Sequence, residues 1–459
     1  VGSEMCIRDS TKGVGGRVGE MSSISYFGRI GYTFDNRYNI MVNFRADAFD
    51  RSKLDKKARW GYFPSVSAAW RLSDENFMNF SRRALDDAKI RISWGITGNE
   101  QIGNYDYLYS YATGDIYDGV GGVYPARLAV DNLRWEETRQ VDVGLDLSFF
   151  NSRLTITADY YDKYTDGLLA NRELPKESGF STMRTNVGEV SNRGFEFSVT
   201  GVPVTTRHFN WTSTFNIDTN VTRIEKLNIA EGQSAGTGVT RMVVGDKLNN
   251  IWGYKTNGIA QLDEDLTQVA QLPNRPMVAG EQKYQDIKKD GIIDLNDEVI
   301  LGNLAPKFSF GFNNSFSYKN FNLNLFLEGT YGNDVINYTR KELESMDGSY
   351  NNITTVLDRW TPQNPGGKLP RADAVSNSSG FSDRWVEDGS YLRIRDLTIG
   401  YTIPRKFLRG IASINVFVSF ENLYTFTKYT GNDPSIGGGI DQNLYPTSRK
   451  YSLGVSMTF

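Results

Sequence analysis

The stretch DIKKDGIIDLND, residues 286–297, is the part of the chain whose residue types and spacing best suit metal chemistry. It carries carboxylates at positions 1, 5, 9 and 12 of a twelve-residue loop and Gly291 at position 6, an arrangement similar to an EF-hand calcium loop. Lys288 stands where a third ligand belongs, and position 12 is Asp rather than the longer Glu. An acidic turn held by hydrogen bonds is therefore the alternative to a calcium site. The candidate calcium ligands are Asp286, Asp290, Asp294 and Asp297.

Other side chains that catalyse reactions are scarce. The single histidine, His208, lies in a short turn, and the single cysteine, Cys6, lies in VGSEMCIRDS, which has no strand pattern. One turn histidine supports neither a histidine-based triad nor a histidine zinc cluster. Carboxylates such as Asp142, Asp146 and Asp159 could pair as in a glycosidase. A wetted barrel wall explains them more simply, because they alternate with apolar residues, and we predict that the protein is not an enzyme.

Two loop features have competing interpretations. Tyrosines at 105, 107, 109, 111 and 117 cluster after Gly98. Aromatic rings can stack on sugars, but strand extensions also carry alternating tyrosines, and both interpretations stay open. The glycines and asparagines of NVGEVSNRGFE, residues 186–196, are predicted to form turns rather than to bind a ligand.

The elements that must position these residues are β-strands, and the clearest are the two arms between Gln140 and Tyr161. In QVDVGLDLSFF apolar and polar residues alternate without a break, and RLTITADYY alternates in the same way after Asn-Ser. The short polar turn predicts an antiparallel hairpin. Its aspartates need water and its apolar face needs an apolar neighbour. Many such strands in one chain are typical of a membrane barrel with lipid outside and water inside.

Thirteen segments show strand patterns, mostly over 10–13 residues, which suits tilted membrane spans. The pattern slips near Asp396, which predicts a β-bulge. The predicted strands are 24–34, 38–47, 61–73, 88–98, 139–150, 153–165, 192–203, 209–222, 307–318, 321–332, 391–403, 411–424 and 450–459.

Connections between these strands alternate between short turns, such as 35–37, and long loops, such as 166–191 and 223–306. The intermediate connection 74–87 takes a short-turn place and is predicted to be partly helical. Short periplasmic turns and long extracellular loops are the plan of outer-membrane barrels. Counting back from the last strand, the first strand begins on the long-loop side. Because bacterial barrels close with both ends at the periplasmic rim, we expect at least one further strand upstream.

Composition and length narrow the classes further. A chain of 459 residues exceeds one ordinary soluble domain, and its net charge of -3 argues against a nucleic-acid partner. The sequence contains no run of about 18 apolar residues, so it predicts no transmembrane helix. The 13% of aromatic residues suits the girdles of a membrane barrel. We expect residues 1–21 to be a non-barrel stretch, partly non-native, and residues 22–459 to form the barrel.

The last predicted strand, YSLGVSMTF, alternates cleanly and ends on an aromatic residue. A terminal aromatic residue on an alternating strand is similar to the insertion signal of outer-membrane barrels. The predicted signal residues are Tyr451, Leu453, Val455, Met457 and Phe459.

Several stretches between Tyr26 and Phe459 match one family in number and order. They include YFGRIGYTFDNRYNI, RWGYFPSVSAAWRLSDENF, KIRISWGITGNEQIGNY, NVGEVSNRGFEFSVTG, YLRIRDLTIGYTIP and SFENLYTFTKYTGNDP. The chain resembles the SusC/RagA family of TonB-dependent outer-membrane transporters.

The resemblance implies an all-β, antiparallel transmembrane barrel in the bacterial outer membrane, with 13 strands here of about 22 in this transporter class. It implies uptake of oligosaccharides or peptides, driven by TonB, with a SusD-like surface lipoprotein as a lid. The plug domain and TonB box of the family are not recognised in this sequence, so we expect them upstream. A passive porin-like barrel and a secreted soluble β-protein that binds glycans are the rival interpretations.

Overall fold

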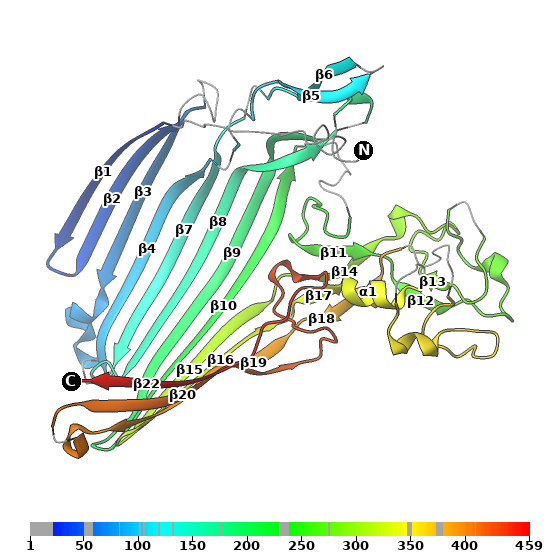
Figure 1. Ribbon diagram of the computed structural model, residues 1–459. Helices are drawn as coiled ribbons and strands as arrows, with labels where there is room; N and C mark the ends of the chain where they lie inside the picture. The colour runs from blue at the N-terminus through cyan, green and yellow to red at the C-terminus, as the bar shows by residue number, and fades with distance from the viewer. Residues whose placement is uncertain are drawn as a thin grey trace, which may run out of the picture.

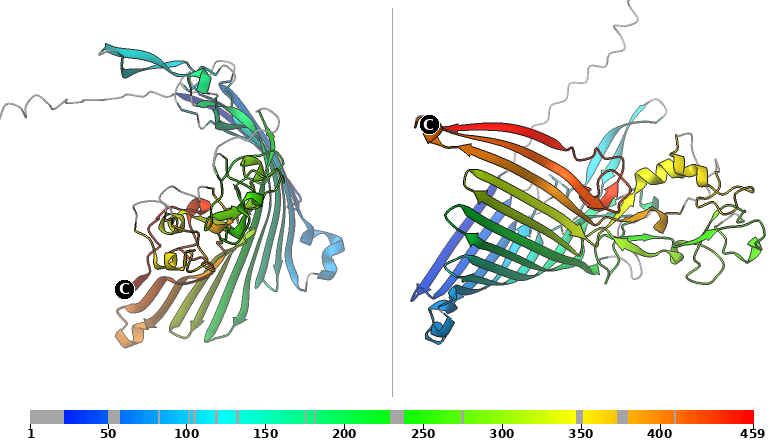
Figure 2. Two further views of the ribbon diagram at one scale, coloured as in Figure 1. Left: turned by 90° about the vertical axis from the view of Figure 1, so that its right-hand side faces the viewer. Right: turned by 90° about the horizontal axis from the view of Figure 1, so that it is seen from below.

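One large antiparallel sheet organises the chain in the computed structural model (Figure 1). Each strand of this sheet is hydrogen-bonded to the next one along the chain, and the sheet curls so that one face is concave (Figure 2). The structure describes residues 22–459 apart from 50–57, 82, 101, 104–105, 118–119, 131–132, 175, 181, 229–237, 274–275, 347–350, 373–379 and 409.

The thirteen predicted strands are confirmed as the thirteen strands of this sheet, and β1 and β22 are its two edges. The predicted bulge near Asp396 is also confirmed, because the register between β19 and β20 shifts between Ile394 and Asp396. The strands are β1 (Ser23–Phe34), β2 (Tyr38–Phe49), β3 (Trp60–Arg71), β4 (Leu85–Asn99), β7 (Glu136–Phe149), β8 (Leu154–Glu173), β9 (Thr182–Thr205), β10 (Phe209–Leu227), β15 (Phe308–Tyr318), β16 (Phe321–Tyr331), β19 (Tyr391–Ile403), β20 (Ser413–Thr427) and β22 (Lys450–Thr458).

Period-two alternation gives the sheet an apolar convex face. The strand register sets Ile92 of β4 opposite both Ala68 of β3 and Val143 of β7, and sets Val143 opposite Tyr160 of β8. Ile92 is 50% exposed and Tyr160 is 49% exposed. An exposed apolar belt of this extent requires an apolar environment. Further exposed members of the belt include Ile30, Tyr32, Ile40, Val42, Ile90, Val141, Phe195, Ile399 and Val418.

Aromatic residues border this apolar belt near both ends of the strands. On β3, Tyr62 and Trp70 lie eight residues apart, which is roughly 26 Å along a strand at about 3.3 Å per residue. This spacing matches the apolar band of about 25 Å that crosses an outer membrane. Stacked or tilted ring pairs are Tyr38–Trp70 and Phe321–Tyr401 toward one rim, and Tyr26–Trp60 and Phe308–Tyr331 toward the other.

One rim of the sheet carries the short connections, and we call it the short-turn rim. Its turn residues Asp35, Asn36 and Lys319 have positive φ, as tight hairpins require. The connection from β3 to β4 contains η1 (Leu72–Asp74) and η2 (Asn76–Ser81), so the predicted helical character is confirmed in the form of 3-10 turns. A further 3-10 turn, η8 (Arg405–Leu408), joins β19 to β20.

Two predictions for the opposite, long-loop rim were wrong. Residues 166–191, predicted as a loop, mostly belong to β8 and β9, which continue beyond the rest of the sheet. NVGEVSNRGFE forms no turn and lies within β9. Its glycines allow close approach instead, because a Cβ at Gly188 would collide with the carbonyl oxygen of Lys226.

The remaining long loops contain short elements that sequence periodicity is too brief to reveal. Figure 1 shows them beyond the long-loop rim, and the left view of Figure 2 shows most of them on the concave side of the sheet. They are β5 (Ser110–Tyr117), β6 (Val120–Arg127), β11 (Asn250–Gly253), β12 (Thr256–Ile259), β13 (Gln282–Tyr284), β14 (Val299–Asn303), β17 (Asp334–Asn337), α1 (Tyr338–Glu344), β18 (Val386–Asp388) and β21 (Ile440–Asp441).

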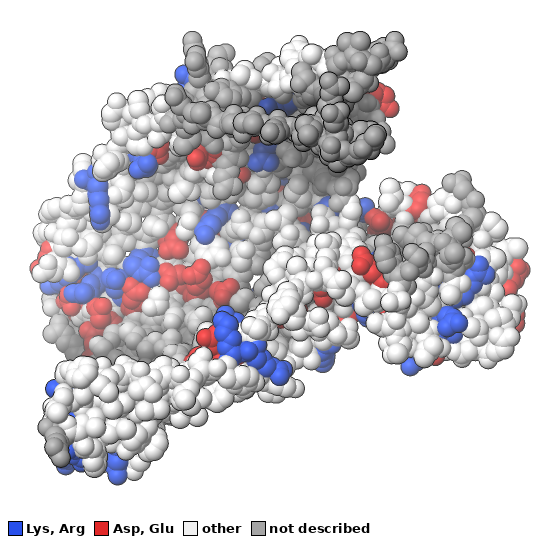
Figure 3. All heavy atoms as spheres, viewed as in Figure 1, with Lys and Arg blue, Asp and Glu red and all other residues white. Residues whose placement is uncertain are grey.

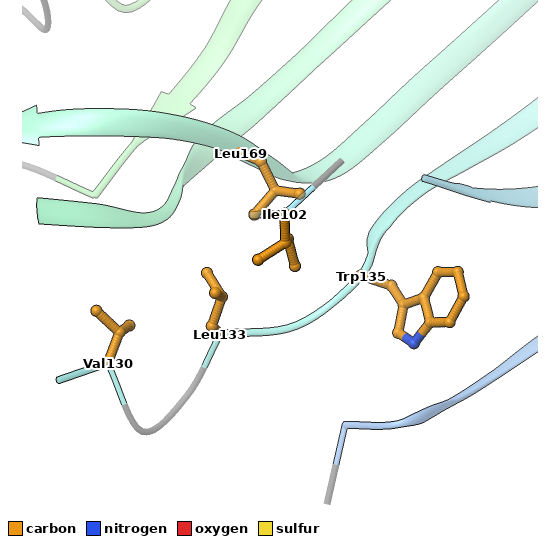
Figure 4. Packing of buried hydrophobic residues seen from close by; sticks show 5 residues of the cluster. All are labelled: Ile102, Val130, Leu133, Trp135 and Leu169. Carbon is orange, nitrogen blue, oxygen red and sulfur yellow. The ribbon is translucent and has the colours of Figure 1, made fainter. Parts of the chain in front are cut away.

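A small hydrophobic cluster packs the loop before β7 against the sheet (Figure 4). Trp135 is 5% exposed, and its Nε1 donates a hydrogen bond to the carbonyl oxygen of Ala58 at 2.8 Å. The cluster therefore joins the loop before β7 to the loop before β3. Its buried members are Ile102, Val130, Leu133, Trp135 and Leu169.

Among the described residues, no helix is long and apolar enough to cross a membrane.

Candidate functional site

The concave face of the sheet carries charged side chains, which gather in bands over its strands (Figure 3). Arg91 of β4 donates to Asp146 of β7 through Nε (2.9 Å) and Nη2 (3.0 Å), and to Asp159 of β8 through Nη2 (2.8 Å). Lys89 also pairs with Asp146 at 2.9 Å. Asp146 and Asp159 are therefore neutralised by cations from β4, as expected of a polar wall rather than of a catalytic pair.

The sign of the charge changes across this concave wall. Strands β1–β4 contribute mainly cations and β7–β10 mainly anions. Asp159 lies opposite Glu196 of β9, which lies opposite Asp218 of β10. The wall is thus polar and electrically polarised, which suits a hydrated path rather than an apolar one. The cations on β1–β4 are Arg29, Arg45, Arg71, Lys89 and Arg91, of which Arg45 and Arg71 pair with Asp47 and Asp87. The anions on β7–β10 are Asp142, Asp146, Asp159, Glu196 and Asp218, beside the cation Lys163 on the same face.

A cleft of about 940 Å³ opens within the long-loop elements. Helix α1 places Arg340 and Glu344 on its wall, and the helix begins where Asn337 accepts a hydrogen bond from the Arg340 backbone N–H at 2.8 Å. Most of the side chains on its wall are polar, which suits a hydrogen-bonding ligand. The polar groups that matter below are Gln261, Gln282, Arg340, Glu344, Asp383 and Arg384.

Two arginines set the electrostatics of this cleft. Arg340 donates hydrogen bonds to Glu344 (3.1 Å) and to Glu387 (3.0 Å), so its positive charge is paired with two carboxylates. Arg384 stacks over Trp385 at 4.4 Å and lies 3.6 Å from Glu344. Desolvation lowers the pKa of Arg384. Its buried Nε and Nη2 lack a hydrogen-bond partner within the described part of the chain, and Nη2 is held by the ion pair with Glu344.

A second network anchors the last long loop to β19. Arg393 is 3% exposed and donates to Thr425 (2.8 Å), Ser435 (3.0 Å) and Asp433. Desolvation alone would raise the pKa of Asp433, but hydrogen bonds from Ser435, Thr447 and Arg393 outweigh it and hold this pKa well below its ordinary value. The loop is thereby fixed over the end of the strand.

The predicted tyrosine cluster is only partly described. Tyr109 and Tyr111 meet edge to face at 5.1 Å between ring centroids, and both are exposed. Tyr107 packs against the cluster of Figure 4. Tyr105 and the side chain of Tyr117 lie outside the described residues. Sugar stacking and strand extension both remain predictions for this segment.

The predicted calcium loop is a compact turn in which carboxylates accept backbone hydrogen bonds. Asp286 accepts from Gly291 at 2.8 Å, and Asp290 accepts from Ile292 at 3.0 Å. Asp297 is buried and accepts from Ile287 and Asp294, both at 2.9 Å. Desolvation raises the pKa of Asp297, but these backbone donors outweigh it and lower the pKa.

These contacts match the hydrogen-bonded alternative for residues 286–297. Within the described part of the chain, no group of three or more His, Cys, Asp or Glu side chains is arranged to hold a metal ion. Calcium binding by this loop therefore stays a prediction. His208 lies in the exposed turn between β9 and β10, and Cys6 lies outside the described residues.

The predicted insertion-signal residues form one exposed face of the edge strand β22. Tyr451 is 64% exposed, Leu453 75% and Phe459 78%, and among the described strands β22 pairs with β20 alone. Arg405 donates to the backbone oxygen of Phe459 at 2.8 Å, which fixes the end of the strand. A role of this strand in membrane insertion remains a prediction.

Residues 9–423 match the family described as TonB dependent receptor-like, beta-barrel. The chain belongs to this family. TonB-dependent receptor barrels lie in the bacterial outer membrane, so the convex face contacts lipid, the short-turn rim is periplasmic and the long loops are extracellular.

Relatives support this assignment. A TonB-dependent receptor of Formosa agariphila is 33% identical over 96% of this chain and 46% of its own length. The TonB-dependent receptor SusC of Bacteroides thetaiotaomicron is 30% identical over 95% of this chain and 44% of its own length. The RagAB peptide transporter matches with a TM-score of 0.83 and 26% identity, over 96% of this chain and 48% of that chain. The chain thus spans about half the length of these relatives.

Proposed function

We propose that this TonB-dependent receptor barrel imports oligosaccharides or peptides across the outer membrane. The described strands supply part of the lumen wall, and the long-loop elements supply the entrance. One observation carries the proposal: charged side chains cover the concave wall of the sheet, and an extracellular cleft with mostly polar side chains lies among the long loops, on a fold similar to a peptide transporter. Polar cargo needs such a hydrated route.

The proposed partners follow from the same relatives. SusC and RagAB support a SusD-like surface lipoprotein that closes over the extracellular loops. We propose that TonB supplies the energy for import by acting on a plug domain in another part of the full-length protein. A calcium ion in the 286–297 loop would stabilise the entrance and stays part of the proposal.

The extracellular cleft gives the proposal its substrate-binding residues. Gln261 and Gln282 offer amide donors and acceptors, and Arg384 offers a guanidinium for a carboxylate or a sugar hydroxyl. The residues that line the cleft carry both positive and negative charges. The cleft therefore suits neutral or zwitterionic cargo better than a strongly charged polymer.

Binding to the purified full-length receptor tests this assignment. Oligosaccharide and peptide pools are titrated separately, and bound species are identified by native mass spectrometry. We expect one class to bind and Arg384→Gln to weaken it ~10-fold or more, because a charge-assisted hydrogen bond is lost. Arg193→Gln, on the convex face and paired with Asp162, is the matched control. Binding that is indifferent to Arg384→Gln would remove the cleft from the mechanism.

A further inference from the structure

The connection between β3 and β4 is unusual among the periplasmic turns. It contains two 3-10 turns, η1 and η2, whereas the β19–β20 connection contains one, η8, and connections such as 35–37 and 319–320 are tight hairpins. The left view of Figure 2 shows this helical connection projecting from the convex side of the sheet, the side that contacts lipid. It therefore lies next to the membrane and away from the lumen.

Two phenylalanines on this otherwise largely polar projection are exposed to the outside of the barrel. Phe80 is 82% exposed and Phe77 is 60% exposed. The Phe77 and Trp70 rings meet edge to face with their centroids 6.4 Å apart, and Trp70 in turn stacks on Tyr38. The exposed phenylalanines are thus continuous with the aromatic girdle at the periplasmic end of the lipid-facing belt.

Polar contacts hold the projection in place. Glu75 accepts hydrogen bonds from Trp70 Nε1 at 3.1 Å and from Arg37 at 3.3 Å, and it also accepts from the Tyr38 hydroxyl. These three donors come from β2, β3 and the turn before β2. Glu75 therefore fixes the angle at which the helical connection leaves the barrel.

A cation follows the exposed phenylalanines. Arg83 lies just after η2 and is exposed, with no ion pair or hydrogen bond to another described residue. The 3-10 turn η8 on the same rim also has a cation beside an exposed aromatic residue, because Phe407 is 66% exposed and Lys406 lies 5.1 Å from the centre of its ring. Exposed aromatic residues beside cations match the interface between acyl chains and phosphate headgroups.

We propose that residues 72–81, together with Arg83, form an interfacial anchor in the periplasmic leaflet of the outer membrane. Phe77 and Phe80 enter the boundary between headgroups and acyl chains, and Arg83 binds a phospholipid phosphate. The anchor fixes the height and tilt of this side of the barrel against the membrane. It goes beyond the proposed transport function and does not depend on which substrate is carried.

Depth measurements in vesicles test the anchor. Phe80→Cys in the full-length receptor is labelled with an environment-sensitive fluorophore and reconstituted into phosphatidylethanolamine–phosphatidylglycerol vesicles. Lipids spin-labelled near the headgroup should quench it strongly, lipids labelled deep in the chain less, and aqueous iodide weakly. His208→Cys, in the exposed β9–β10 turn of the same rim, is the matched control and should be quenched mainly by iodide.

The opposite pattern would overturn the proposal. Iodide quenching at position 80 equal to that at position 208 would mean that the projection stands in water. Shielding from iodide without quenching by any lipid would mean that a protein surface covers it. A second variant, Arg83→Gln, should reduce the headgroup quenching of the label at position 80, because both lipids carry the phosphate that Arg83 binds, and unchanged quenching would remove Arg83 from the anchor. Transport is not read out, so failure here leaves the import proposal untouched.

Discussion

A buried ion pair on the extracellular side, Arg393–Asp433, stabilises the attachment of the last long loop to β19. Asp433 and Arg393 are both largely buried, with side-chain exposures of 13% and 4%. Replacing Asp433 by Asn should free the last long loop, because breaking a buried ion pair costs roughly 3–5 kcal/mol. Hydrogen exchange of residues 429–447 would report the opening. The exposed pair Lys450–Glu421 is the control, and Glu421→Gln should cost about 1 kcal/mol or less.

The same carboxylate predicts a pH dependence. Folding lowers the pKa of Asp433, so its contribution to stability is present above the unfolded pKa of about 3.9 and is lost as the pH falls through the lower folded value. Protection of the loop should therefore be constant from neutral pH down to about 4 and should fall only below that. Loss of protection near pH 6 would contradict the pairing.

On the convex face, one substitution tests whether the face contacts lipid or water. Leu145 lies mid-strand on β7, opposite Ile90 and Ala158. Leu145→Arg should cost roughly 2–4 kcal/mol at the membrane midplane and reduce the assembled barrel seen by heat-modified gel migration. Thr157→Arg, on the concave face opposite Asp146, is the matched control and should assemble. Equal assembly of both variants would argue against a lipid-facing belt.

At the scale of the element, β9 depends on glycines where neighbouring backbones come close. A Cβ at Gly188 would collide with the Lys226 carbonyl, whereas a Cβ at Gly201 of the same strand would meet its nearest atom at 3.9 Å. Gly188→Ala should therefore destabilise the barrel by about 1–3 kcal/mol, and Gly201→Ala should change little. Urea unfolding of the two variants in lipid vesicles would measure the difference, and equal midpoints would refute the close approach.

The terminal strand makes a prediction about assembly. Phe459→Ala should slow insertion into the outer membrane in cells, because it removes the aromatic end of the exposed face of β22. Ser456→Ala, on the opposite face of the same strand and paired with Asn415, should insert normally. Pulse-chase acquisition of protease resistance distinguishes them. Equal insertion rates would remove the signal role from this strand.

Strands were predictable and loops were not, for a physical reason. Alternation in QVDVGLDLSFF reports a local requirement, one face in lipid and one in water, which each strand meets by itself. The continuation of β8 and β9 past the rim escaped prediction because Asn186 and Gly188 are residues typical of turns. Here Asn186 instead donates to the backbone oxygens of Arg134 and Gly167.

At the scale of the whole molecule, the candidate site could not be read from the sequence at all. The cleft brings together Gln261, Arg340 and Arg384, which lie far apart in the chain and share no motif. Asn337 is the N-cap of α1, but one capping residue predicts neither the helix nor the cleft. The acidic loop 286–297, by contrast, was visible in the sequence, but its carboxylates are occupied by backbone donors.

Energy-dependent uptake by cells that carry the full-length receptor tests the central claim most directly. The bound class identified by titration is supplied in labelled form, and accumulation is measured with and without TonB and with a proton-gradient uncoupler. We predict accumulation that stops when TonB is deleted or the gradient is collapsed, while the amount of receptor in the outer membrane is unchanged. Uptake that continues at the same rate without TonB would contradict the account and would make the protein a passive pore.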